Sequence, residues 1–322
     1  MDQHAPDPTA RRTPLPTPPL QPPALLTTAE LLRRGHGHVA IRAMVRSGEL
    51  THVRRGHYLA RPGDDEGLRR ARIHAALASG RESLVVSHGS AALLWGLPVR
   101  RAATDQIQLS EPGARRSRQQ GDIHLHGGAL PPGDVVERGR LRLTSVERTV
   151  VDLARSQDLR WALVSADAAL HRGMATRESL LSQLESQAGT RGMGRARPAI
   201  VLADALVESP GESLCRAAIR QHGLPDPELQ HNLYDEAGFV GRVDFWWKAQ
   251  RVVLEFDGRD KYFANARPGT TPQDVLWAEK KREDRLRALG CIMVRCTWDE
   301  VLHHPEVVAR RVLQALERAV VG

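Results

Sequence analysis

The alternation of apolar and polar positions predicts four short elements within residues 25–62. Apolar residues recurring at helical spacing predict two helices, and the capping-box residues Thr27 and Glu30 open the first of them. Two short alternating runs on either side of the turn Arg54-Arg55-Gly56 predict a β-hairpin. The order helix, turn, helix, hairpin is typical of a winged helix-turn-helix.

Basic side chains coincide with the predicted second helix and with the hairpin turn. Arg42 and Arg46 lie one helical turn apart, and Arg54 and Arg55 form the tip of the hairpin. Arginine bonds to phosphate or guanine through a planar fork of donors, so these four residues are candidate DNA contacts. The alternative is that they form the solvated face of a small helical domain.

Residues 63–155 mix helical and alternating segments, which predicts an α/β region. One predicted helix stops at Gly96 and another covers 144–155. Three alternating runs predict a small sheet: 106–110, 122–126 and 140–144. His124 and His126 share one face of the middle strand. Because no further ligands are evident nearby, an exposed strand face is favoured there over a metal site.

Two segments of this region are specific enough to suggest a family. They are Ser87-His88-Gly89-Ser90-Ala91-Ala92-Leu93-Leu94-Trp95-Gly96-Leu97-Pro98 and Thr144-Ser145-Val146-Glu147-Arg148-Thr149-Val150-Val151-Asp152-Leu153-Ala154-Arg155. With the winged-helix pattern before them, they resemble the AbiEi-type antitoxins of abortive-infection systems over about 25–155. The resemblance implies DNA binding and operon autoregulation. It also implies a role in phage defence or a toxin–antitoxin system, with a cognate toxin or operon DNA as partner.

In the last third of the chain, carboxylate residues occur within apolar runs or at their ends. Glu212 lies in the first turn of a helix that Ser209-Pro210 begins. Asp244 interrupts an apolar strand, and Glu255 and Asp257 end the following one. The three strands are predicted at 229–234, 241–248 and 251–256.

Strand geometry predicts that these carboxylates converge. Glu255 and Asp257 lie two residues apart and share one face, while Asp244 is expected on the neighbouring antiparallel strand. Converging carboxylates repel one another, and Mg²⁺ or Mn²⁺ would relieve that repulsion and activate water toward a phosphodiester. Asp244, Glu255 and Asp257 are therefore candidate metal ligands. The structural alternative pairs Asp244 with Arg242 or a buried arginine, and makes Asp257-Gly258 a simple turn.

Five segments together resemble the PD-(D/E)xK nuclease superfamily, and more narrowly the very-short-patch-repair-like domains of unknown function fused to AbiEi-type modules. The segments are 209–214, 241–245, 255–258, 277–286 and 290–298. The resemblance covers nearly all of 205–300. It implies that Glu212, Asp244, Glu255 and Asp257 are the catalytic acidic residues.

The chain departs from that family at two positions. Asp257 occupies the usual place of the active-site lysine, and Lys261 stands where a histidine is often found. Lys261 is the candidate cation beside the phosphate. Two functions stay open: a Mg²⁺-dependent endonuclease, and a non-catalytic DNA-binding regulator or antitoxin that uses the nuclease fold as a binding surface.

Composition agrees with a DNA partner and sets limits on location. The formal net charge of +8 favours a polyanion, although an arginine-rich composition without such a partner gives the same value. The three cysteines form no CxxC pair, which favours a reducing cytoplasm. No signal peptide or bilayer-spanning apolar run is evident, so no membrane partner is expected.

The predicted fold class is therefore multidomain α+β. It has an N-terminal winged helix, a mixed α/β middle region and a C-terminal core like that of restriction endonucleases. Residues 1–24 are rich in proline and are expected to be a disordered tail. The expected divisions after this tail are 25–62, 63–155, a helical connector at 156–204, and 205–322.

Overall fold

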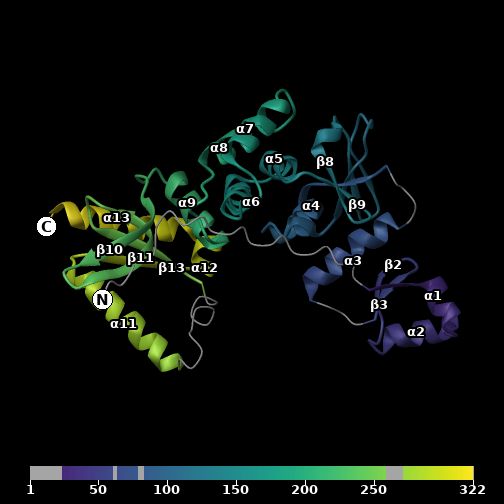
Figure 1. Ribbon diagram of the computed structural model, residues 1–322, viewed down its shortest axis with the longest axis horizontal. Helices are drawn as coiled ribbons and strands as arrows, with labels where there is room; N and C mark the ends of the chain where they lie inside the picture. Colours follow the sequence, from purple (N-terminus) through teal and green to yellow (C-terminus); the bar gives the residue numbers. More distant parts are fainter. Residues whose placement is uncertain (1–23, 61–63, 79–82, 259–270, 322) are drawn as a thin grey trace, which may run out of the picture. The chain divides into compact units, whose positions relative to one another are not determined.

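The structure, a computed structural model, describes residues 24–60, 64–78, 83–258 and 271–321 (Figure 1). The expected tail lies outside the described residues except for Ala24, and Lys261 also lies outside them. Over these residues the chain is a mixed α/β protein with three sheets, and it divides into two compact units. Unit 1 combines residues 1–156 and 172–200, and unit 2 combines residues 157–171 and 201–322.

The beginning of unit 1 is a small three-stranded antiparallel sheet with helices packed on it. Its order is β1-β3-β2. Apolar clusters centred on Leu31 and Ile41, and on Val53 and Ala71, join the helices to the strands. The elements are β1 (Leu25–Thr27), α1 (Thr28–Arg33), α2 (His38–Arg46), β2 (Thr51–Arg54), β3 (His57–Leu59) and α3 (Asp65–Leu77).

The capping box predicted at the first helix is confirmed. The backbone N–H of Thr27 donates to Glu30 Oε2 at 2.6 Å, and the backbone N–H of Glu30 donates to Thr27 Oγ1 at 3.1 Å. Two otherwise unpaired amides of the first turn are thereby satisfied.

A six-stranded mixed sheet, ordered β6-β7-β5-β4-β9-β8, forms the rest of unit 1 with its helices. The three predicted strands are present, and Gly96 ends the helix with a φ of 72°, as its lack of a Cβ allows. The elements are β4 (Val85–Val86), α4 (His88–Trp95), β5 (Ile107–Ser110), β6 (Arg118–Gln120), β7 (Ile123–His126), β8 (Val135–Arg138), β9 (Leu141–Thr144), α5 (Val146–Ser156), α7 (Arg177–Ser186) and α8 (Met193–Leu202), with short 3₁₀ turns at Arg101–Thr104 and Pro132–Asp134.

Unit 2 is a four-stranded sheet, β10-β11-β12-β13, with helices on both faces. β10, β11 and β12 run antiparallel, and β13 runs parallel to β12. Val252 and Leu254 face a core shared with α6, α9 and α13, whereas Val253 faces α11. The elements are α6 (Leu159–His171), α9 (Pro210–Gln221), β10 (Glu228–Asp235), β11 (Gly238–Trp247), β12 (Val252–Asp257), α11 (Pro272–Ala288), β13 (Ile292–Thr297), α12 (Trp298–His303) and α13 (Pro305–Val321).

Helix α6, from the stretch expected to be a connector, is part of the core of unit 2. Its Asp167 is 1% exposed and accepts from Arg216 Nη1 at 3.1 Å on both oxygens. The backbone N–H of Asp204 also donates to Asp167, at 2.8 Å. Burial raises the pKa of Asp167 to about 6, and Arg216 opposes that rise.

Among the residues that the structure describes, no helix has both the length and the apolar character needed to cross a bilayer. The three cysteines are buried and have free thiols. The Sγ atoms of Cys215 and Cys296 lie 3.2 Å apart, between α9 and β13.

Candidate functional site

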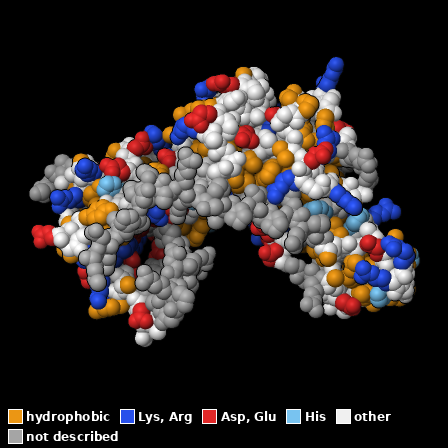
Figure 2. All heavy atoms as spheres, in the orientation of Figure 1, with side chains coloured by type: hydrophobic (Ala, Val, Ile, Leu, Met, Phe, Trp, Pro, Cys, Tyr) orange, Lys and Arg blue, Asp and Glu red, His pale blue; other side chains and the backbone are white. Residues whose placement is uncertain are grey.

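Helix α2 presents basic and apolar side chains to solvent together. Arg42 and Arg46 are exposed, and Val39 between them and the helix start is 71% exposed. The opposite side of the helix is anchored by Ile41, which is 3% exposed. In Figure 2 basic side chains are visible over the segment formed by α1, α2 and the hairpin.

The two arginines of the hairpin turn differ in their surroundings. Arg55 is exposed at the tip, next to Gly56, whose φ of 79° permits the tight turn. Arg54 instead forms an ion pair with Asp122, with 2.9 Å between Nη1 and Oδ1. Arg72 of α3 reaches the same carboxylate at 3.1 Å. Arg55 is therefore more available to a ligand than Arg54.

In unit 2 the first acidic residue is held at the start of α9. Glu212 is 2% exposed, and its Oε1 accepts from Ser209 Oγ at 2.6 Å. Its Oε2 accepts from the backbone N–H of Glu208 at 3.0 Å and from Gln230 Nε2 at 2.9 Å. The carboxylate thus stabilises the helix start and also faces the sheet.

Close packing of α9 on β12 brings Glu212 to the strands. A Cβ added at Gly211 would lie 2.1 Å from the ring of Phe256, so only glycine permits this approach. The same ring packs edge-on against Trp298, with 5.0 Å between centroids. The sequence Pro210-Gly211-Glu212 therefore serves both the helix start and the position of its carboxylate.

Gln230 joins Glu212 to Asp244. It has a φ of 50° and lies between the paired positions Leu229 and His231, opposite Asp244. This local irregularity redirects its side chain, whose Nε2 lies 2.9 Å from Glu212 Oε2 and 3.4 Å from Asp244 Oδ1. One amide group therefore bridges two carboxylates.

Asp244 also binds the backbone of the neighbouring strand. The N–H of Phe256 donates to Asp244 Oδ2 at 2.9 Å. Arg242, the partner considered from sequence, instead pairs with Glu208 at 2.8 Å. The predicted antiparallel pairing of the Asp244 and Glu255 strands is confirmed by the register Phe245–Leu254.

Arg282 of α11 binds the third carboxylate. Its Nη2 donates to both oxygens of Glu255, at 2.8 and 2.9 Å. Burial raises the pKa of Glu255, Arg282 opposes that rise, and the neighbouring Asp244 carboxylate adds to it. Asp257 ends β12 and is partly exposed, with Thr297 as its partner in the parallel register.

Glu212, Asp244 and Glu255 gather at one end of the sheet, but the described residues do not form a metal cage. Over the described part of the chain, no group of three or more His, Cys, Asp or Glu side chains could hold a metal ion. Glu212, Asp244 and Glu255 each accept hydrogen bonds from protein donors on both oxygens. As arranged here, the residues therefore do not fit a divalent cation.

Two residues of this site, Gln230 and Arg282, are absent from the sequence prediction. Gln230 lies within a predicted strand, where nothing in the sequence marks the positive φ that redirects it. Arg282 belongs to a helix of mixed charge, a pattern typical of a solvated face. The only signal for Arg282 was its place in the segment 277–286 that carries the nuclease resemblance.

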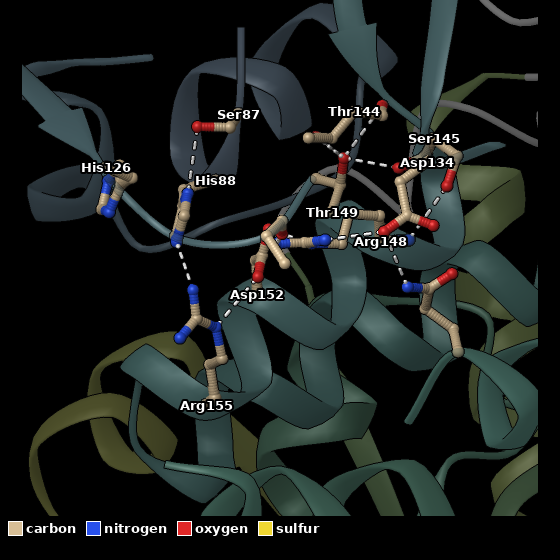
Figure 3. Close-up of polar contacts among 12 residues, drawn as sticks. Ser87, His88, His126, Asp134, Thr144, Ser145, Arg148, Thr149, Asp152 and Arg155 are labelled. Atoms are coloured by element: carbon tan, nitrogen blue, oxygen red, sulfur yellow. Dashed lines mark hydrogen bonds and ion pairs between the residues drawn. The ribbon is translucent and has the colours of Figure 1, made fainter. Parts of the chain in front are cut away.

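Unit 1 contains a second polar cluster, buried where α4 and α5 meet (Figure 3). Figure 3 shows Arg148 between Asp134 and Asp152, with contacts of 2.6 and 2.9 Å. Arg155 Nε donates to the other oxygen of Asp152 at 2.9 Å, and its Nη2 lies 3.5 Å from His88 Nε2. Arginine only donates, so His88 Nε2 accepts and Nδ1 carries the proton.

The histidines of β7 extend this cluster. The ring of His126 stacks on that of His88, and the ring of His124 stacks on His126 with 4.2 Å between centroids. His124 and His126 thus share a face, as predicted, but His126 is partly covered by His88 rather than lying on an open strand face. The rings lie parallel and do not point at a common centre.

Comparison with known proteins gives relatives without an assigned function. No family model matches the chain. Two Mycobacterium tuberculosis proteins are 31% identical over 278 residues, which cover 85% of this chain and 95% of each relative. They are the uncharacterized proteins MT2308, of strain CDC 1551 / Oshkosh, and Rv2248, of strain ATCC 25618 / H37Rv.

Among solved structures, the crystal structure of the RV2827C protein from Mycobacterium tuberculosis is similar at a TM-score of 0.38 and 18% identity. The match covers 66% of this chain and 84% of that chain. A likeness this weak supports no conclusion about function.

Proposed function

The chain belongs to the same family as the uncharacterized Mycobacterium tuberculosis proteins MT2308 and Rv2248, and for this member we propose DNA binding through helix α2 and the β2–β3 hairpin. The observation that carries the proposal is the exposed surface formed by Val39, Arg42 and Arg46, with Arg55 on the hairpin of the same small sheet. We name these four residues the α2–hairpin surface.

The topology of this segment supports a winged helix. Two helices precede a hairpin whose strands pair with β1 in the order β1-β3-β2. In winged-helix proteins the second helix of the pair enters the major groove. There the guanidinium groups of Arg42 and Arg46 would bind guanine or phosphate, and Val39 would contact a thymine methyl group.

The test is a titration of duplex DNA measured by fluorescence anisotropy at several salt concentrations. Arg42→Ala/Arg46→Ala should weaken binding and lower the slope of log K against log salt by about two if both residues contact phosphates. The matched control is Arg195→Ala/Arg197→Ala, which removes the same charge from exposed positions on α8. Equal losses of DNA affinity in the two double variants would mean that only the overall charge matters, and would contradict the proposal.

Unit 2 favours a second candidate function, phosphodiester hydrolysis. The element order α9-β10-β11-β12-α11-β13, with β12 and β13 parallel, supports the PD-(D/E)xK resemblance. Glu212, Asp244 and Glu255 lie at one end of that sheet. A Mg²⁺ or Mn²⁺ cofactor belongs to this proposal, but the ligand arrangement described above does not receive one without rearrangement.

A cleavage assay separates this candidate from the regulator or antitoxin. Plasmid and single-stranded DNA are incubated with the full-length protein and with Glu255→Gln, each with Mg²⁺, with Mn²⁺ and with EDTA. Cleavage that requires metal and is lost in Glu255→Gln supports the endonuclease. DNA binding without cleavage supports the regulator, with operon DNA or a cognate toxin as the partner to seek next.

A further inference from the structure

The buried carboxylate of Glu255 already has a cation from the chain itself. The side chains of Glu255 and Arg282 are only 14% and 22% exposed. One guanidinium nitrogen of Arg282 donates to both carboxylate oxygens. A charge-assisted contact of this kind, largely removed from water, is much stronger than an ion pair on the surface.

Neighbouring charges hold Arg282 in place. Glu279, one turn earlier on α11, accepts from Arg282 Nε at 2.9 Å and from Nη2 at 2.8 Å. Arg295 of β13 binds Glu279 at 3.0 Å and Glu283 at 3.1 Å, and its Nε lies 3.9 Å from Glu255. Arg282 therefore lies between two carboxylates that are themselves fixed by a second arginine.

The backbone of β11 also limits where this guanidinium can go. A Cβ added at Gly241 would lie 3.0 Å from Arg282 Cδ and 3.2 Å from Nη1, so the side chain packs directly on the strand. Arg282 thus lies over the sheet, beside the residue pair Asp244 and Glu255, rather than extending into solvent.

We infer that Arg282 is the resident counter-ion of the acidic site and that a divalent cation reaches Glu255 only when Arg282 has left it. A divalent cation at Glu255 would lie next to the positive guanidinium of Arg282, which contacts both carboxylate oxygens, and like charges this close repel each other strongly. The inference explains why the carboxylates converge without a metal cage, since an arginine offsets part of their mutual repulsion.

The group that would displace Arg282 from Glu255 is a nucleic acid phosphate, and this part of the inference rests on the proposed function. Phosphate binds arginine through the planar fork of donors, and in Arg282 those donors are engaged by Glu279 and Glu255. A phosphodiester arriving at α11 would compete for Arg282, and Lys280 and Lys281 are exposed on the same helix. Arrival of the nucleic acid backbone and release of Glu255 would then be one event.

The experiment measures Mn²⁺ binding to the full-length protein by electron paramagnetic resonance, without DNA. Arg282→Gln should bind one Mn²⁺ about tenfold or more tightly than the wild type, equivalent to at least about 1.4 kcal/mol. Adding Glu255→Gln should abolish that gain. The control is Arg285→Gln on the same helix, whose guanidinium binds Asp235 instead and should leave affinity at the wild-type level. Equal affinity in Arg282→Gln and the wild type overturns the inference.

A second variant covers the case in which Arg282→Gln does not fold. Arg282→Lys keeps the positive charge but lacks the planar fork, so its Mn²⁺ affinity should exceed that of the wild type by a smaller factor. No increase in a folded Arg282→Lys variant also overturns the inference.

Adding duplex DNA to the wild type separates the two proposals. Bound DNA that tightens Mn²⁺ binding supports displacement of Arg282, and bound DNA without any change overturns that step. Failure to bind DNA removes the proposed function, while a gain of Mn²⁺ affinity in Arg282→Gln still establishes Arg282 as the counter-ion.

Discussion

The imidazole ring of His88 lies flat against that of His126, with 3.6 Å between their centroids and 11° between their planes. Burial lowers the pKa of both rings, and for His88 the nearby Arg155 lowers it further. The pKa of His126 falls to about 2, with His88 and His124 contributing after burial. The stacked rings of His88 and His126 are therefore neutral in the folded protein.

This arrangement predicts that the protein loses stability in mild acid. Below pH 6.5 His88 and His126 are protonated in the unfolded chain but stay neutral in the folded chain. The free energy of unfolding therefore decreases as the pH is lowered. The expected slope is about 1.4 kcal/mol per pH unit for each residue. Urea unfolding at pH 7.0, 6.0 and 5.5 measures it.

His126→Phe is the diagnostic variant for that slope. Phenylalanine keeps an aromatic ring against His88 but has no proton to gain, so the pH dependence should become shallower. An unchanged slope in His126→Phe would assign the effect to other groups.

The buried pair of Asp167 and Arg216 predicts a large effect from a single substitution. Arg216→Met leaves the Asp167 carboxylate buried without its cation, and should cost about 3–5 kcal/mol in the free energy of unfolding. The control is Arg242→Met, because the pair of Arg242 with Glu208 is more exposed and should contribute about 1 kcal/mol or less. Similar losses in the two variants, measured by urea unfolding, would contradict the role given to burial.

The close packing at Gly211 predicts that alanine, which usually stabilises a helix relative to glycine, destabilises the protein at this position. Gly211→Ala would press a methyl group into the Phe256 ring, and should destabilise by about 1–3 kcal/mol. Gly194→Ala in α8 meets nothing within 4 Å and should stabilise by about 0.5–1 kcal/mol. Thermal unfolding of both variants tests the pair. A stable Gly211→Ala protein would show that α9 is not in close contact with β12.

The hydrogen bonds of Asp244 predict that removing its charge while keeping its shape lowers the free energy of unfolding. In Asp244→Asn the amide NH₂ must face either the Phe256 N–H or the Gln230 Nε2 group, both of which are donors. In metal-free buffer this should lower the free energy of unfolding by about 1–3 kcal/mol. Asp226→Asn, in an exposed pair with Arg220, is the control and should change it by under about 1 kcal/mol. A stabilised Asp244→Asn would mean that carboxylate repulsion outweighs these hydrogen bonds.

Most elements of unit 2 could be predicted because their signals are local. Ser209 and Pro210 mark the start of α9, and predominantly apolar runs mark β11 and β12. The convergence of Asp244 and Glu255 followed from strand pairing alone. The partners of those carboxylates could not be predicted, because they depend on one left-handed residue at Gln230 and on how α11 packs on the sheet.

Helix α8 has a proline in its interior, where proline is usually excluded. In the structure α8 starts at Met193, runs through Pro198 and ends at Leu202. Pro198 has no N–H to donate to Gly194, and the packing of Ala196, Ala199 and Ile200 in the core outweighs that loss.

Helix α6 has a consequence for any attempt to divide the gene. The backbone enters unit 2 at residue 157, returns to unit 1 at residue 172 and enters unit 2 again at residue 201. A fragment cloned from 201 onward would lack α6, leaving Arg216 without Asp167 and the core without Val164. We therefore expect such a fragment to aggregate on expression. Recombination that moved unit 2 to another gene would have had to carry residues 157–322 together, including the segment 172–200 that belongs to unit 1.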